Sequence, residues 1–154
     1  MPLLVVRHAR AGSRRHWDGP DEKRPLSGRG RRQAAALVKV LAPFAPTRIL
    51  SSPFVRCVQS VEPLSEKLGV AVEPSDALAE GAPAEEVVAL ARSLMGSTAV
   101  LCGHGDVNSA LLDALVRDDR LKLPKHYECA KGSTWVLHAR KGRYANASYL
   151  PAPP

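Results

Sequence analysis

Aromatic residues are scarce in this chain: it has two Trp, three Tyr and two Phe among 154 residues. A core must therefore be built from Ala, Val and Leu, which suits helices packed on a sheet better than an aromatic-rich β-sandwich. With 45% hydrophobic and 24% charged residues, the composition is typical of one globular domain with a single core. We expect that domain to span residues 1–150 and the proline-rich residues 151–154 to form a disordered tail.

Long hydrophobic runs are also missing. The longest, such as Leu3 to Val6, are far shorter than the ~18 to 20 residues that a membrane span requires. Only Met1 and Pro2 precede this run, without the basic and small residues of a secretory signal. The sequence therefore predicts a cytoplasmic protein with no membrane partner.

Cysteine is rare, and its spacing indicates no metal or disulfide framework. Cys57, Cys102 and Cys129 are an odd number of thiols without a C-x-x-C pair, so buried, reduced thiols are expected. The histidines at positions 16, 126 and 138 fit no metal-ligand spacing. We expect neither a metal nor another cofactor.

Positive charge, in contrast, is abundant near the N-terminus. The whole chain carries a net charge of +7, and residues 1–32 hold nine Lys or Arg against three acids, a balance of +6. Such a cluster favours an anionic partner: a phosphorylated small molecule, a phosphoprotein or a nucleic-acid backbone. A merely solvated basic surface is the alternative. The acids among these residues, Asp18, Asp21 and Glu22, are expected to form ion pairs with the surrounding arginines rather than a metal site.

Hydrophobic periodicity predicts strands alternating with helices. Strands are expected at residues 3–6, 48–51, 70–73 and 98–102, and a closing hairpin at 133–139 and 144–150 around Lys141-Gly142. Helices are expected from the N-cap Ser27 to Pro43, from Ser52-Pro53 onward with a kink or split at Pro63, at 84–95, and from Val107. This order predicts an α/β fold, a three-layer α/β/α sandwich whose mainly parallel sheet ends in an antiparallel edge hairpin.

Four polar side chains follow three of the expected strands. Arg7 and His8 end the first strand, Arg56 begins the helix after the second, and His104 follows the strand at 98–102. Because the carboxyl ends of parallel strands share one edge of a sheet, we expect these side chains to converge there, beneath the polar loop 9–26. Guanidinium groups and the N-terminus of a helix together suit a tetrahedral phosphate dianion.

The segments LLVVRHARAG, SSPFVRCVQS and CGHGD, at residues 3–12, 51–60 and 102–106, carry a family resemblance. The chain resembles the histidine phosphatase, or phosphoglycerate-mutase-like, superfamily over about residues 3 to 150. Its length resembles that of the small bacterial phosphohistidine phosphatases. The KRPL, VRCxQ, EPL and KGSTW patterns are most similar to the histidine-phosphatase domain that follows a Nudix domain in some MutT-like hydrolases.

The resemblance implies a metal-independent phosphatase with a covalent phosphohistidine on His8, which water then hydrolyses. It places Arg7, Arg56 and His104 around the phosphoryl group. Glu80 matches the position of the family's proton donor, and Asp106 is the alternative. Because Ala-Arg-Ala-Gly follows His8, unlike the usual mutase pattern, a mutase is not expected. The two arginines should also depress the pKa of His8 and keep its ring neutral.

Further residues are expected to contact the phosphate or the rest of the substrate. These are Ser13, Arg14, Lys23, Arg24, Ser52, Gly105 and Asp106, although helix capping alone is the simpler role for Ser52. The substrate could be a protein phosphohistidine, which needs an open mouth, or a small phosphorylated metabolite or nucleotide. A nucleotide would need a flat wall, for which Trp17 and Tyr127 are candidates.

Two other functions remain open at this point. A catalytically silent phosphate-recognition module would use the same pocket without turnover. A nucleic-acid-binding domain would use the basic N-terminal cluster, but the chain offers no interleaved aromatic residues for stacking. We therefore expect an anionic phosphorylated substrate, and no nucleic acid, as the partner.

Overall fold

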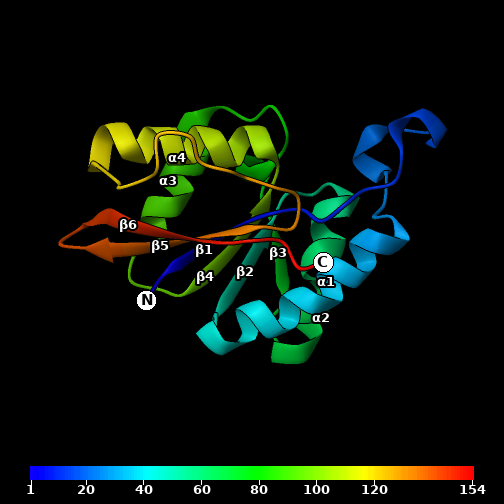
Figure 1. Ribbon diagram of the computed structural model, residues 1–154, viewed down its shortest axis with the longest axis horizontal. Coiled ribbons are helices and arrows are strands. Elements are labelled where there is room, and N and C mark those ends of the chain that lie inside the picture. Colours follow the sequence, from blue (N-terminus) through cyan, green and yellow to red (C-terminus); the bar gives the residue numbers. More distant parts are fainter.

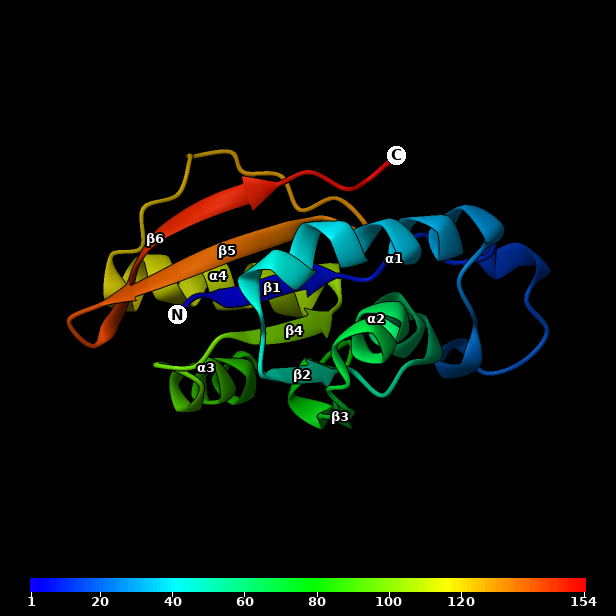
Figure 2. The same cartoon turned by 90° about the horizontal axis from the view of Figure 1, so that it is seen from below.

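The computed structural model describes residues 1–154 and contains one six-stranded sheet (Figure 1). The strand order is β3-β2-β4-β1-β5-β6. The first four strands of this order run parallel, and β5 and β6 add an antiparallel pair at the edge beyond β1 (Figure 2). The bounds are β1 Leu3–Arg7, β2 Arg48–Ser51, β3 Val72–Pro74, β4 Ala99–Gly103, β5 Thr134–Arg140 and β6 Arg143–Leu150.

Four α-helices cover the two faces of the sheet (Figures 1 and 2). Those on one face are α1 (Gly28–Leu41) and α2 (Val55–Leu68), and those on the other are α3 (Ala84–Ser93) and α4 (Gly105–Asp119). No helix is both long and apolar enough to cross a bilayer. The expected three-layer α/β/α sandwich with an antiparallel edge hairpin is confirmed.

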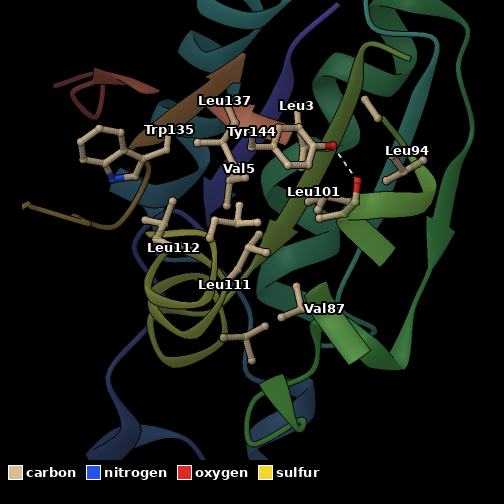
Figure 3. Packing of buried hydrophobic residues seen from close by; sticks show 14 of the residues in the cluster. Leu3, Val5, Val87, Leu94, Leu101, Leu111, Leu112, Trp135, Leu137 and Tyr144 are labelled. Atoms are coloured by element: carbon tan, nitrogen blue, oxygen red, sulfur yellow. Dashed lines mark hydrogen bonds between the residues drawn. The ribbon is translucent and has the colours of Figure 1, made fainter. Parts of the chain in front are cut away.

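Alternation along β1 divides the core into two parts. Leu3 and Val5 pack toward α3 and α4, whereas Leu4 and Val6 pack toward α1 and α2, because successive side chains of a strand point to opposite faces. Figure 3 shows the part of the core between the sheet and helices α3 and α4. There the buried Tyr144 hydroxyl donates a hydrogen bond to the Ala91 carbonyl oxygen at 2.6 Å. A sheet buried on both faces accounts for the uniformly apolar β1 sequence.

The start of α2 differs from the sequence prediction. The helix begins at Val55 with Phe54 as its N-cap, rather than at Ser52-Pro53. Pro63 does not split it, because α2 is one continuous helix through that residue. The buried side chains of Val61 and Leu64 pack on the sheet around Pro63, and this packing offsets the hydrogen bond that a proline removes.

The chain end also departs from expectation. Residues 151–154 continue onward from the end of β6 (Figure 2), and the Gln33 side chain on α1 donates a hydrogen bond to the Pro153 carbonyl oxygen at 3.2 Å. Pro153 itself is buried. These contacts hold a segment that its composition alone predicts to be disordered.

Gly30 is the point at which α1 touches the loop after β1. A Cβ atom there would lie 1.9 Å from the Arg10 carbonyl oxygen, whereas one at Gly28 would meet only the flexible end of Arg32 at 3.7 Å. Alanine favours a helix over glycine by about 1 kcal/mol, but this backbone clash should outweigh that gain. We expect Gly30→Ala to lower the free energy of unfolding in urea by about 2 kcal/mol or more. The matched variant Gly28→Ala should be neutral or stabilising, and equal effects of the two would refute the close approach.

Candidate active site

The carboxyl edge of the sheet holds a pocket of about 760 Å³. Arg7 ends β1, His8 follows it, Arg56 lies in the first turn of α2, and His104 stands between β4 and α4. All four line this pocket, and the ring centroids of His8 and His104 are 5.5 Å apart. The convergence expected from the parallel topology is therefore present.

The His8 ring is buried in a defined orientation, with the residue 6% exposed. Its Nδ1 lies 2.7 Å from the Ala9 carbonyl oxygen. A carbonyl oxygen only accepts, so Nδ1 carries the hydrogen and Nε2 keeps its lone pair. The pKa of His8 is lowered to about 3: burial is the largest cause, the Ala9 hydrogen bond acts in the opposite direction, and the charges of His104, Arg56 and Arg7 add to the lowering. The expected direction is correct, but burial outweighs the arginines as its cause.

This depressed pKa makes stability sensitive to acid. Below pH 6.5, the ordinary pKa of histidine, His8 is protonated in the unfolded chain, whereas in the folded chain it stays neutral down to about pH 3. The free energy of unfolding therefore falls as the pH drops from about 6.5 to 3. Between about pH 7 and pH 4.5 we expect wild type to lose roughly 2 to 3 kcal/mol more unfolding free energy than His8→Gln. Urea unfolding of both proteins at the two pH values measures this, and equal losses would contradict it.

Two arginines are held by the backbone and by one acid. Arg7 Nη1 donates to the Cys129 carbonyl oxygen at 2.7 Å, and a Cβ at Gly105 would come within 3.0 Å of the Arg7 guanidinium. Gly105 thus leaves room for this arginine beside the start of α4. Arg56, 1% exposed, donates to the Asp21 carbonyl oxygen at 2.8 Å and to its Oδ2 at 3.0 Å.

Asp21 connects the loop over the pocket to Arg56 beneath it. Besides Arg56 it pairs with Arg24, whose Nε lies 2.9 Å from Oδ1. Burial acts to raise the pKa of Asp21, but the hydrogen bonds from Arg24 and Arg56 outweigh it and lower the pKa. The prediction that the loop acids are ion-pair partners is therefore confirmed for Asp21, whereas Asp18 and Glu22 form no ion pair.

Ser52 supports His104 rather than capping α2. Its Oγ lies 2.9 Å from His104 Nε2 and accepts a hydrogen bond from the Phe54 amide at 3.2 Å. The Phe54 ring meets the imidazole edge-on at a centroid distance of 4.7 Å. His104 Nδ1 has no hydrogen-bond partner in the protein, which leaves it available to an oxygen bound in the pocket.

Two carboxylates line the same pocket. Glu80 Oε1 lies 3.7 Å from Arg56 Nη2, 3.9 Å from His104 Nδ1 and 4.0 Å from Arg14 Nη2. Asp106, at the start of α4, accepts a hydrogen bond from the Gly81 amide at 2.9 Å. Glu80 therefore lies close to two arginines and to His104, whereas Asp106 holds the backbone at Gly81, next to Glu80.

The remaining expected contacts divide into two groups. Ser13, Arg14, Arg24 and Gly105 line the pocket, whereas Lys23 and Ser52 do not. Lys131 lines it as well and was not expected to, although it lies in the KGSTW pattern. Burial lowers its pKa, and the nearby charges of Arg7, Arg10, Arg24 and Arg14 lower it further.

Comparison with known proteins fits this arrangement. Residues 3–87 match the family model of the histidine phosphatase superfamily (branch 1). The chain belongs to the histidine phosphatase superfamily. It is 36% identical over 156 residues to an 8-oxo-(d)GTP phosphatase of Mycolicibacterium smegmatis, an alignment that includes 98% of this chain. The chain spans about half (48%) of that relative's length.

Solved phosphatase structures have the same fold. The protein histidine phosphatase SixA complexed with tungstate superposes with a TM-score of 0.77 at 18% identity, covering 97% of this chain and 94% of that one. A mycobacterial glucosyl-3-phosphoglycerate phosphatase complexed with VO3 gives a TM-score of 0.75 at 20% identity, with 96% of each chain covered. Similarity at these identities concerns the fold alone.

Proposed function

We propose that this chain is a metal-independent phosphatase that acts through a covalent phosphohistidine on His8. The observation that carries the proposal is a neutral, buried imidazole whose Nδ1 is tied to Ala9, in a pocket shared with two arginines and a second histidine. A neutral imidazole is a competent nucleophile, and fixed cations suit the charge that spreads over phosphoryl oxygens in the transition state.

The reaction then has two balanced steps. His8 Nε2 attacks phosphorus, a P–N bond forms, and the bond from phosphorus to the leaving group breaks, with a proton passing from Glu80 to that group. Water next attacks phosphorus, gives its proton to the Glu80 carboxylate and breaks the P–N bond, which releases phosphate and restores neutral His8. Arg7, Arg56 and His104 hold the equatorial oxygens throughout.

Hydrolysis of p-nitrophenyl phosphate in excess EDTA tests this proposal. No three His, Cys, Asp or Glu side chains lie close enough together to hold a metal ion, so we expect EDTA to leave the rate unchanged. Loss of activity on chelation would contradict the mechanism. Binding of vanadate or phosphate without hydrolysis of any phosphorylated compound would instead support a silent recognition module.

The choice between Glu80 and Asp106 as proton donor predicts a dependence on the leaving group. p-Nitrophenolate leaves readily without a proton, whereas an alkoxide does not. We expect Glu80→Gln to slow hydrolysis of glycerol phosphate by roughly 100-fold while changing the p-nitrophenyl phosphate rate only a few-fold. Asp106→Asn is the matched variant. If it, rather than Glu80→Gln, produced the selective loss, Asp106 would be the donor.

The relatives differ in the substrates that their names state: an 8-oxo-(d)GTP, a protein histidine and a glucosyl-3-phosphoglycerate. We propose that the chain is most similar to the histidine-phosphatase domain of MutT-like Nudix hydrolases. It is 36% identical, over 98% of its length, to a relative named for 8-oxo-(d)GTP, and this similarity favours a nucleotide among the substrates.

A further inference from the structure

A second hollow adjoins the phosphoryl pocket. It has a volume of about 300 Å³ and is lined by Arg14, Trp17, Gly19, Asp21 and Glu80. Arg14 and Glu80 also line the main pocket, and their charged groups are 4.0 Å apart. Arg14 and Glu80 therefore form a border that the two hollows share.

Trp17 forms an aromatic wall of that hollow. It is 36% exposed, whereas Trp135, the other tryptophan, is 3% exposed within the core. Exposing an indole forgoes the burial that usually stabilises it, so a ring left open beside a pocket is typical of a binding surface.

The indole is nevertheless held in place. Its Nε1 donates a hydrogen bond to the Pro20 carbonyl oxygen at 2.8 Å. Gly19 borders the same ring, since a Cβ there would be in van der Waals contact with Nε1 at 3.6 Å. A ring that is already fixed loses little conformational entropy when a flat ligand stacks on it.

We propose that this hollow holds the base of a nucleotide, stacked on Trp17, while the phosphoryl group lies against His8. The proposal rests on the proposed phosphatase function. Arg14, Arg24 and Lys131 supply further positive charge in the main pocket for the anionic groups of such a ligand. Tyr127 does not provide the flat wall: its hydroxyl donates to Asp113 at 2.9 Å, its ring packs on Trp135, and it lines neither hollow.

A protein phosphohistidine fits these features less well. Its imidazole is bonded directly to phosphorus, so it would lie inside the main pocket, and the phosphorylated residue has no second flat ring to place on Trp17. A nucleotide instead places a sugar between the two sites and a flat base at the far one. The observations thus favour a nucleotide over a phosphoprotein.

Binding to the His8→Gln variant tests the proposal without turnover. GMP and GTP are the probes, and ribose 5-phosphate and inorganic triphosphate are their counterparts without a base. We expect each nucleotide to bind at least roughly 10-fold more tightly than its counterpart and to quench tryptophan fluorescence, since stacking on an aromatic side chain contributes on this scale. Adding Trp17→Ala should abolish the advantage, and Trp17→Phe should restore part of it.

The control is Val116→Ala, which truncates another exposed apolar side chain, on α4, and should keep the full advantage. An unchanged nucleotide preference in Trp17→Ala would overturn the proposal. So would quenching by a phosphohistidine peptide but by neither nucleotide, which would point to a phosphoprotein. If nucleotides bind through Trp17 but wild type hydrolyses no phosphoryl compound, the base site stands and the phosphatase function fails.

Discussion

His8→Gln is expected to lower kcat for p-nitrophenyl phosphate by roughly 10⁴-fold or more, because the covalent path is lost with its nucleophile. Glutamine is polar and uncharged, like the neutral imidazole, so the pocket keeps its balance of charges. Its amide nitrogen, however, has no free lone pair with which to attack phosphorus. The loss should fall on kcat rather than on KM, because Arg7, Arg56 and His104 still bind the phosphoryl group.

His138→Gln is the matched control for this variant. His138 is an exposed residue on β5, outside the pocket, so its replacement should leave kcat within a few-fold of wild type. Urea unfolding at neutral pH should show that both variants are folded. A His8→Gln enzyme that retained a tenth or more of wild-type kcat would exclude His8 as the nucleophile.

Arg56→Lys is expected to lower kcat/KM by roughly 10² to 10³-fold, although it preserves the charge. The guanidinium bonds Asp21 through both terminal nitrogens and is almost fully buried. An ammonium group cannot hold Asp21 and a phosphoryl oxygen in the same fork geometry. Lysine is preferred to alanine in this test, because it keeps the positive charge and changes only the geometry of the donor group.

Arg48→Lys provides the comparison for that change. Arg48 also makes a two-pronged pair, with Glu73 at 2.7 and 3.0 Å, but both side chains are more than two-fifths exposed. Exposed pairs contribute little to stability, and this one lies outside the pocket. In steady-state kinetics, Arg48→Lys should therefore keep a kcat/KM near that of wild type, whereas Arg56→Lys should not. A wild-type kcat/KM in Arg56→Lys would show that the fork geometry is not needed.

The sequence was sufficient to predict the layers and the meeting of Arg7, His8, Arg56 and His104. The layers follow from strands that alternate with helices. The meeting of the four side chains follows because parallel strands place their carboxyl ends at one edge of the sheet. Apolar runs such as Leu3 to Val6 mark buried strands irrespective of long-range contacts. Hydrophobic patterns and the order of strands and helices along the chain are therefore enough to predict the layers and the place of the site.

Other features depend on contacts between distant segments. Ser-Pro is a common start for a helix, and only the tertiary structure shows Ser52 bonded to His104. Lys131 reaches the pocket because β5, which follows it, pairs with β1. The low pKa of His8 arises chiefly from burial, which charge counting along the chain does not measure. The packing of Tyr127 on Trp135, which leaves Trp17 as the exposed ring, likewise depends on contacts between distant segments.

Trapping the covalent intermediate tests the central claim most directly. Wild-type enzyme turning over p-nitrophenyl phosphate would be quenched rapidly in alkali, where phosphohistidine survives, then digested and mapped by mass spectrometry. We predict one phosphoryl group on the peptide that contains His8, lost on acid treatment and absent from His8→Gln. A phosphoryl group on any other residue, or steady turnover with none on the protein, would contradict the account.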